Sequence, residues 1–257
     1  MSIFQALVLG IVQGVTEFLP ISSSGHLVLF QQYFGLSEDI LVFDVFLHLA
    51  TLGAIIIFFG KTLFKVTFKE WFLIGVGTIP AVIIGLLFKD QIENLFASGI
   101  FLGVEFMMTG LINFYIDRRL NGMKLESTSE TVPLTVYKSL AIGVAQALAI
   151  IPGISRSGST VAGAVSFKMS REEAFRFSFL LAIPALAGAG VLQLSEADAS
   201  IFQSFSPLLI IIGSLSAFGS GIASLALFKY VIDKAKFEWF GWYCLSLGSL
   251  ILFFQIT

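Results

Sequence analysis

The sequence predicts an all-α protein that crosses a membrane several times, on two observations. First, 56% of the 257 residues are hydrophobic and only 12% are charged, whereas an average soluble domain has about 25% charged residues. Second, several apolar stretches approach the roughly 20 residues that cross a hydrocarbon core about 30 Å thick. They cover residues 41–60, 70–88, 98–116, 174–194, 207–228 and 238–256. A membrane β-barrel would instead show segments of about ten residues with alternating polarity.

Thirteen of the fifteen Lys and Arg residues flank one set of helix ends. They are Lys61, Lys65, Lys69, Arg118, Arg119, Lys124, Lys138, Lys168, Arg171, Arg176, Lys229, Lys234 and Lys236. The opposite ends, around Glu38–Asp39, 89–97 and 195–206, contribute only Lys89. Because basic residues concentrate in cytoplasmic loops, the thirteen mark the cytoplasmic side.

This charge distribution predicts where each segment begins and ends. Residues 1–40 must begin and end outside, and residues 139–173 must begin and end inside. Both segments are apolar but are interrupted by Pro and Gly, which is typical of two short helices that enter and leave by the same face. Non-helical backbone at that depth is tolerated only where protein buries it or where it lines a cavity.

The predicted architecture is therefore an inverted-topology repeat within a single membrane domain of residues 1–257. Each half is a re-entrant helical hairpin followed by three transmembrane helices. The halves cover residues 1–116 and 139–257, and the polar stretch 117–138 is the cytoplasmic linker. Transporters with this architecture place their sites near the midplane, at broken helices.

The two predicted hairpins match each other at a fixed offset of 133 residues. The identical positions are Gly10, Gln13, Ile21, Ser22, Ser24 and Gly25, which match Gly143, Gln146, Ile154, Ser155, Ser157 and Gly158. The positions that differ chemically pair Glu17 with Ile150, Ser23 with Arg156, and His26 with Ser159. An acid and an imidazole on one copy and a cation on the other predict one composite site where the two halves meet.

Gln13 and Glu17 are four residues apart and therefore share one helix face. An ionisable side chain inside a membrane is costly and is read first as functional; the alternative is a buried carboxylate that is hydrogen-bonded to the backbone. Pro20 ends this short helix. The hydroxyls that follow, with free N–H groups at the next helix start, predict an anion site, although one of them could simply cap the helix. These residues are Ser22, Ser23, Ser24, Gly25 and His26.

Arg156 is the basic residue that lies neither near a predicted cytoplasmic end nor at Lys89. A guanidinium binds phosphate through two parallel hydrogen bonds, and its neighbours supply hydroxyls and free N–H donors. The neighbours are Gly153, Ser155, Ser157, Gly158, Ser159 and Thr160. The anion could be a substrate phosphate, or Glu17 in a purely structural ion pair.

The remaining polar groups in apolar segments give weaker signals. Asp44 and His48 form another pair four residues apart, which we expect to support the site from outside it. Glu105 has no predicted partner and no predicted role. The spacing of the carboxylates and histidines does not indicate a metal site, and no Gly-rich loop precedes Lys-Ser/Thr, so nucleotide hydrolysis has no support. Nothing resembles a basic nucleic-acid footprint, and Cys244 is the single cysteine.

These residues closely resemble the undecaprenyl-diphosphate phosphatase family of bacterial inner membranes, also called the bacitracin-resistance family. One family motif is Glu/Gln-x-x-x-Glu followed by Pro-x-Ser-Ser-x-Gly-His, present from Gln13 to His26. The second is Pro-Gly-x-Ser-Arg-Ser-Gly-x-Thr, present from Pro152 to Thr160. The likeness covers the whole chain, and position 13 carries Gln where some members carry Glu.

The resemblance implies hydrolysis of undecaprenyl diphosphate to undecaprenyl phosphate and inorganic phosphate, which recycles the lipid carrier for cell-wall polymers. It also implies an inverted repeat of re-entrant hairpins, residence in the bacterial plasma membrane, a site open toward the outer face, and assistance by magnesium or calcium. No organic cofactor is expected. The expected partners are the polyisoprenyl diphosphate and membrane lipid, no nucleic acid is expected, and a homodimer is left open.

The expected mechanism places the isoprenoid tail between helices and the diphosphate between the two loops. Arg156 holds the terminal phosphate, and Glu17 is the general base for Ser23 or for a water molecule. His26 protonates the leaving phosphate or positions the nucleophile, and Gln13 orients Glu17 or a cation. The expected substrate-binding residues are Gln13, Ser22, Ser24, Gly25, Ser155, Ser157, Gly158, Ser159 and Thr160. The alternative is a transporter or lipid flippase without hydrolytic chemistry.

Overall fold

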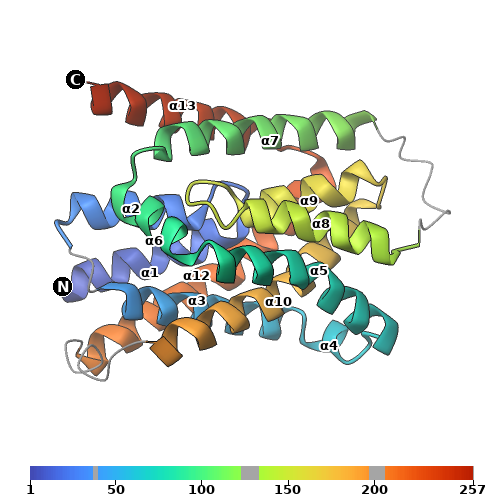
Figure 1. The fold of residues 1–257 in the computed structure, drawn as a ribbon, viewed down its shortest axis with the longest axis horizontal. Helices are drawn as coiled ribbons and strands as arrows, with labels where there is room; N and C mark the ends of the chain where they lie inside the picture. The colour runs from blue at the N-terminus through green and yellow to red at the C-terminus, as the bar shows by residue number, and fades with distance from the viewer. Residues whose placement is uncertain (37–39, 123–132, 197–205, 257) are drawn as a thin grey trace.

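The computed structural model describes residues 1–36, 40–122, 133–196 and 206–256, which are helical with no strand among them. Figure 1 shows the helices running side by side, mostly along the long axis of the molecule. Their bounds are α1 (Ile3–Phe18), α2 (Ser23–Tyr33), α3 (Leu41–Phe58), α4 (Gly60–Leu63), α5 (Phe68–Leu87), α6 (Lys89–Ser98), α7 (Leu102–Gly122), α8 (Val136–Leu148), α9 (Arg156–Ser166), α10 (Arg171–Glu196), α12 (Pro207–Lys234) and α13 (Glu238–Ile256). Glu38, Asp39, Lys124 and the middle of the predicted linker lie outside the described residues.

The apolar stretches fold as helices, which confirms the predicted fold class. By length and composition, α5, α10 and α12 can each cross a membrane, and α6 with α7 would make a fourth span that is bent by 103°. The other predicted stretches, 41–60 and 238–256, fold as α3 and α13.

The structure differs from the prediction at both ends of the third predicted span, residues 98–116. Residues 89–98, expected to be a loop, form α6, and Gly99 ends this helix in the left-handed region at φ 57°, which glycine adopts without steric cost. At its other end α7 continues to Gly122, inside the predicted linker. There Asp117 Oδ1 accepts from the backbone N–H groups of Phe237 at 2.9 Å and Glu238 at 3.2 Å. The extension therefore ties the end of α7 to the beginning of α13.

The two predicted hairpins are formed by α1 with α2 and by α8 with α9. In Figure 1, α1 begins at the left end of the molecule and α8 begins at the right end, and the loops that follow them meet near the middle. The short helix α4 and the end of α7 lie at the right end too. Since Lys61 and Arg118 belong to these two elements, basic residues gather at the end from which the second hairpin enters.

The first helix of each hairpin packs closely against a long helix of the other half. α1 packs on α12, and α8 packs on α5. A Cβ atom added to Gly10 would lie 2.3 Å from Gly213 O, and one added to Gly143 would lie 2.1 Å from Gly77 O. Small residues allow membrane helices to approach this closely. Gly10 and Gly143 are equivalent in the sequence repeat, so both halves use the same position for the same contact.

The last helix of each half, α7 and α13, forms a third close pair. Added Cβ atoms at Gly103 and Gly110 would lie 2.9 Å from the carbonyl oxygens of Gly248 and Gly241, respectively. The register is antiparallel, because the earlier residue on α7 meets the later one on α13. The pairing thus places the last helices of the two predicted halves against each other in opposite directions.

The main apolar core lies beside the loops that join the hairpin helices. It is rich in phenylalanine, and Phe18, Phe179, Phe228 and Phe237 are fully buried in it. The rings meet edge to face, as at Phe18 and Phe179, whose centroids are 5.7 Å apart. Edge-to-face pairs of this kind add about 0.5–1.5 kcal/mol beyond the area they bury, so they give the polar loops a rigid wall.

Candidate active site

Helix α7 holds the loops of both hairpins through two polar side chains one turn apart. Asn113 Nδ2 donates to Pro20 O at 2.6 Å, which fixes the first loop. Thr109 Oγ1 donates to Gly153 O at 2.8 Å and accepts from the Ser155 N–H at 3.0 Å, which fixes the second. Neither residue was predicted from the sequence. Their spacing of four in an apolar helix, which puts both on one helix face, was the pattern that could have indicated them.

The two loops also touch each other directly. Ser157 Oγ donates to Leu19 O at 3.2 Å. A Cβ atom added to Gly25 would lie 3.1 Å from Gly153 Cα, so the glycines let the two backbones approach. Gly153 has φ 83°, a conformation that favours glycine. The predicted meeting of the two repeat motifs is therefore present in the structure.

Glu17 is the centre of the polar cluster at this junction. It lies near the end of α1 and is 7% exposed. Its Oε2 accepts from Ser23 Oγ at 2.5 Å and from Gln13 Nε2 at 3.2 Å. Its Oε1 accepts from Arg156 Nη2 at 2.7 Å. The carboxylate of Glu17, the predicted base, thus contacts three groups. They are the predicted nucleophile Ser23, the orienting amide of Gln13 and the guanidinium of Arg156.

Arg156 begins α9, and its side chain is 13% exposed. Its Cζ lies 5.9 Å from the centroid of the Phe179 ring, so the guanidinium is braced on the aromatic wall. Only one terminal nitrogen is used by Glu17. The other, Nη1, is buried and has no hydrogen-bond partner among the described residues. A buried N–H donor left unpaired is costly, and an anionic ligand would satisfy it.

The serines at the two helix starts repeat one arrangement. Ser22 Oγ accepts from the Gly25 N–H at 3.4 Å, and Ser155 Oγ accepts from the Gly158 N–H at 3.2 Å. Both are therefore helix caps; for the first loop, this is the capping role that the sequence analysis gave as the alternative to an anion site. A second hydroxyl lies beside each cap, Ser24 Oγ at 3.3 Å from Ser22 Oγ and Ser157 Oγ at 3.2 Å from Ser155 Oγ.

Two predicted binding residues of α9 make contacts that hold the helix in place. Thr160 Oγ1 donates to Arg156 O at 2.9 Å and contacts Ser178 Oγ on α10. Ser159 is buried, and its backbone N–H donates to Ser155 O at 2.9 Å. Direct binding by either hydroxyl stays a prediction.

His26 makes contacts that differ from those expected of a residue that protonates the leaving phosphate. Its Nδ1 lies 2.6 Å from Ser22 O, and its Nε2 lies 2.7 Å from Tyr243 Oη on α13. Its ring stacks on that tyrosine and meets Phe106 edge to face. Both ring nitrogens are engaged, so His26 fixes the backbone next to Ser23; its acid role stays a prediction.

The second histidine, His48, was expected to support the site from outside it, but it lies next to Glu17. Its Nε2 is 3.9 Å from Glu17 Oε2. Its Nδ1 bonds the backbone carbonyl of Asp44 at 2.8 Å, whereas the Asp44 carboxylate accepts from Gln31 Nε2 at 2.9 and 2.8 Å. Asp44 and His48 are therefore joined through the backbone, and the imidazole is directed at the site.

The second half lacks the carboxylate, and this makes the site asymmetric. Ile150 stands where Glu17 stands in the first repeat. Gln146, the counterpart of Gln13, is 2% exposed, and neither of its amide atoms has a partner within the described part of the chain. Glu105 packs on the second loop, where its Oε2 would lie 3.0 Å from a Cβ atom at Gly153.

The donor atoms at the junction do not form a resident metal site. Among the described residues, no group of three or more His, Cys, Asp or Glu side chains could hold a metal ion. Both carboxylate oxygens of Glu17 already accept hydrogen bonds. Beside them lies the buried amide oxygen of Gln13, which has no hydrogen-bond partner within the described ranges. One neutral oxygen next to a guanidinium is too few ligands for magnesium or calcium.

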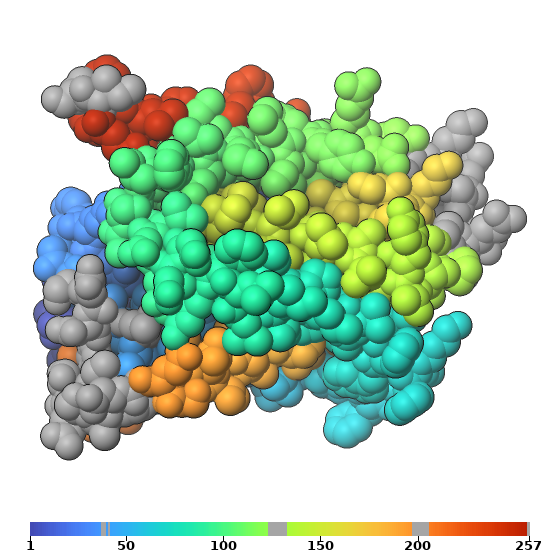
Figure 2. Space-filling view, viewed as in Figure 1, coloured from blue at the N-terminus to red at the C-terminus, as the bar shows by residue number. Residues whose placement is uncertain are grey.

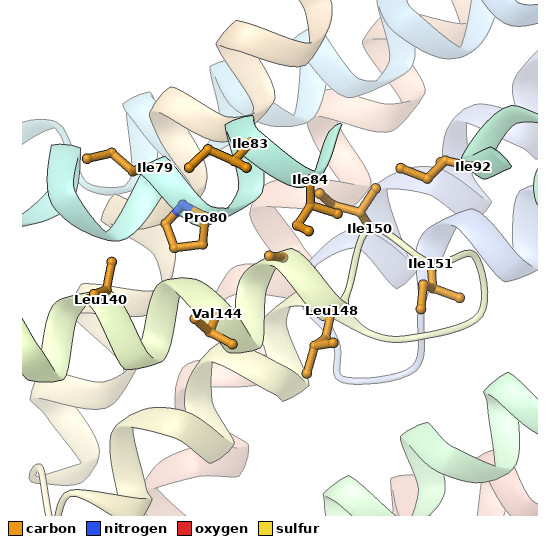
Figure 3. Close-up of a pocket in the computed structure, with 11 residues that line it drawn as sticks. Ile79, Pro80, Ile83, Ile84, Ile92, Leu140, Val144, Leu148, Ile150 and Ile151 are labelled. Carbon is orange, nitrogen blue, oxygen red and sulfur yellow. The ribbon is translucent and has the colours of Figure 1, made fainter. Parts of the chain in front are cut away.

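An apolar groove of about 390 Å³ lies between α5 and α8. Figure 3 shows Ile83 on α5, Val144 on α8 and Ile92 on α6 around it, with Ile150 and Ile151 on the loop after α8. In Figure 2, α5 and α8 lie side by side on the face toward the viewer. The loop that lines this groove continues to Arg156, so one segment joins an apolar groove to the polar junction.

Comparisons with known proteins agree with one another. The sequence model of the family "Bacitracin resistance protein BacA" matches residues 6–250. A protein of Carboxydothermus hydrogenoformans named undecaprenyl-diphosphatase is 45% identical, over 99% of this chain and 98% of the relative. One of Halothermothrix orenii with the same name is 41% identical, over 98% of each chain. Undecaprenyl-diphosphatase 4 of Bacillus thuringiensis is 42% identical, over 100% of this chain and 99% of the relative.

Proposed function

The chain belongs to the bacitracin resistance protein BacA family, and we propose that it hydrolyses undecaprenyl diphosphate to undecaprenyl phosphate and inorganic phosphate. Relatives that match almost the whole chain are named for this activity. The observation that carries the proposal is the three-residue contact at the hairpin junction. Ser23 donates to Glu17 at 2.5 Å, and Arg156 donates to the other oxygen of the same carboxylate at 2.7 Å.

This contact contains the parts of a phosphoryl-transfer site. A serine hydroxyl is a weak nucleophile until a neighbouring base takes its proton, and Glu17 Oε2 already accepts that hydrogen. The Nη1 atom of Arg156 is buried without a partner among the described residues, and it can bind an oxygen of the terminal phosphate. A fixed guanidinium then stabilises the charge that develops on the transferring phosphoryl group.

The reaction balances with these groups. Ser23 Oγ attacks the terminal phosphorus as its proton passes to Glu17, and the phosphoanhydride bond breaks toward the bridging oxygen. Undecaprenyl phosphate leaves with that electron pair. Glu17 then gives up this proton to solvent. Water, deprotonated by Glu17, attacks the phosphoserine; the bond from phosphorus to Ser23 Oγ breaks, Oγ takes the proton from Glu17, and inorganic phosphate leaves. In the alternative, water is the nucleophile from the start and Ser23 orients it; both versions use Glu17 as base.

We propose that the isoprenoid tail lies in the groove between α5 and α8. The groove is lined by aliphatic side chains from α5, α6, α8 and the second loop. That loop also leads to Arg156, so a lipid whose tail contacts Ile150 and Ile151 has its headgroup near the guanidinium. Apolar contact is worth about 25 cal/mol per Å², which makes the tail a large part of substrate binding.

The inverted membrane insertion is also a proposal, as is the orientation of the site toward the outer face of the bacterial plasma membrane. The opposite entry of the two hairpins supports it (Figure 1), as does the equivalent packing of Gly10 and Gly143. The basic residues at one end of the molecule give the direction. A magnesium or calcium ion is proposed to arrive with the diphosphate oxygens, since the protein offers too few ligands of its own.

The experiment that tests the function is phosphate release from undecaprenyl diphosphate by purified protein in detergent. Detergent has no compartments, so a transporter or flippase without hydrolytic chemistry releases no phosphate. We expect equal amounts of undecaprenyl phosphate and inorganic phosphate. Their absence from a folded, monodisperse sample would favour the transport alternative.

A further inference from the structure

Two histidines occur in the chain, and they lie in different environments. Both nitrogens of His26 are engaged, by Ser22 O and by Tyr243 Oη. His48, on α3, uses only Nδ1 for a hydrogen bond, to the Asp44 carbonyl at 2.8 Å. A carbonyl oxygen can only accept, so Nδ1 carries the hydrogen. In the neutral ring the lone pair is then on Nε2, the atom that lies 3.9 Å from Glu17.

His48 lies on the side of Glu17 that receives the proton of Ser23. Oε1 of the carboxylate faces Arg156, whereas Ser23 and His48 both approach Oε2. The side chain of Glu17 is 5% exposed and that of His48 is 30% exposed. The imidazole therefore lies between a buried carboxylate and the outside of the protein, and the proposed opening of the site toward the outer face would give it access to water. The distance of 3.9 Å exceeds a direct hydrogen bond, and one bridging water or a small rotation of the exposed ring closes it.

We propose that His48 receives the proton that Glu17 takes from the nucleophile and passes it to solvent. The proposal rests on the proposed hydrolysis and extends it. The proton leaves Ser23 Oγ as the bond from Oγ to phosphorus forms, and it moves to Glu17 Oε2. From there it moves to the lone pair of His48 Nε2, and the imidazolium releases it to bulk water. His48 acts through Glu17 and makes no contact with the substrate, so it positions and resets the base.

Two carboxylates interact with His48 within the described residues, Glu17 of α1 and Asp44 of α3. From α1 the facing group is Glu17, and Arg156 of α9 lies behind that carboxylate. On α3 itself the Asp44 carboxylate is bound by Gln31. Of the other helices packed on α3, α10 and α12 carry no charged residue between Arg176 and Glu196 or between Pro207 and Lys229, and α4, which follows the end of α3, carries Lys61. A change in the charge of His48 is thus felt by both carboxylates, and of the two it is Glu17 that also contacts Ser23 and Arg156.

The test compares kcat and KM of wild type with those of His48→Gln and Asp44→Asn, from about pH 5 to about pH 9, the range in which histidine changes charge. If His48 accepts the proton, wild-type kcat rises with pH as the imidazole loses its own proton. In His48→Gln this rise of kcat with pH should disappear. We expect kcat to fall by at least about tenfold, although by less than the 10²–10⁴-fold loss that is typical of removing a primary base. KM should change little. Asp44→Asn keeps the backbone carbonyl but removes a carboxylate that interacts with His48, so it should keep this rise of kcat and move it along the pH axis.

Chemical rescue makes the test independent of folding. Added imidazole should restore part of the kcat of His48→Ala and should leave wild type unchanged. The terminal phosphate of the substrate also titrates, but it does so equally in all variants. A His48→Gln enzyme with wild-type kcat and the wild-type pH limb would overturn the inference while leaving the proposed hydrolysis intact. Lack of phosphate release by wild type would instead contradict the proposed function.

Discussion

The guanidinium of Arg156 and the carboxylate of Glu17 meet at 2.7 Å across 139 positions of the chain. Each residue belongs to one of the two repeated hairpins, and neither has its chemical equivalent in the other copy. Because a buried charge is costly unless it is paired, the contact brings the two loops together and keeps both groups ionised. The same contact places the proposed base next to the proposed phosphate-binding cation.

Replacing Arg156 with Lys tests the planar guanidinium separately from its charge. An ammonium cannot donate to Glu17 and to a phosphate oxygen in the same fixed geometry. We expect Arg156→Lys to lower kcat/KM on the order of 10²-fold, the range for removing one donor that stabilises a transition state. Steady-state phosphate release measures it, with Arg118→Lys as the control on an exposed arginine of α7. Activity within a few-fold of wild type would exclude this role.

Replacing Glu17 with Gln separates binding from turnover. The amide keeps the size of the side chain but cannot take a proton, so we expect kcat to fall by about 10²–10⁴-fold. KM should stay near the wild-type value, because the base acts mainly in the transition state. Glu93→Gln, on the exposed helix α6, is the control. If Glu17→Gln keeps its kcat, Glu17 is the counter-ion of Arg156 and not the base.

The nucleophile is identified by Ser23→Ala together with trapping. If Ser23 attacks phosphorus, the variant should lose at least as much kcat as Glu17→Gln, and acid-quenched wild type should yield phosphoserine at position 23. If water attacks directly, Ser23→Ala should retain measurable turnover. Mass spectrometry of the quenched enzyme distinguishes the two cases, since only the first gives a mass increase on the peptide that contains Ser23.

Filling the groove between α5 and α8 should affect long substrates selectively. Val144→Trp places a large side chain where the tail is proposed to lie, and we expect KM for undecaprenyl diphosphate to rise about tenfold or more, since each buried methylene contributes about 0.8 kcal/mol. A short-chain prenyl diphosphate that does not fill the groove should be hydrolysed as by wild type. An equal loss on both substrates, or on neither, would contradict the location of the tail.

Membrane topology can be read with cysteine probes in a Cys244→Ala background. Cysteines at Tyr33 and Gln91 should react with an impermeant thiol reagent added outside, and those at Asn121 and Lys234 should react only after the membrane is opened. All four positions are exposed in the structure.

Probes at Ser37 and Ser200 extend the same test to two positions outside the described residues. Both should label from outside, because the charge distribution places them on one side. Labelling on opposite sides would rule out inverted insertion.

The sequence by itself determined the fold class and predicted that Glu17 and Arg156 belong to one composite site. Apolar stretches of spanning length, Pro and Gly interruptions, and basic residues at one set of ends are local features, and they predict helices and re-entrant hairpins without a partner. Glu17, Ser23 and Arg156 were predicted because an ionisable group inside a membrane must find a partner, and the repeat brought two such groups to corresponding loops.

Only the tertiary structure decided which other side chains reach the site. The rotation of α3 directs His48 at Glu17, and the contact with α13 turns His26 toward Tyr243. Thr109 and Asn113 became visible as loop anchors once α7 lay across both hairpins. Such contacts depend on the packing of helices that are distant in sequence, and close approaches at small residues set that packing.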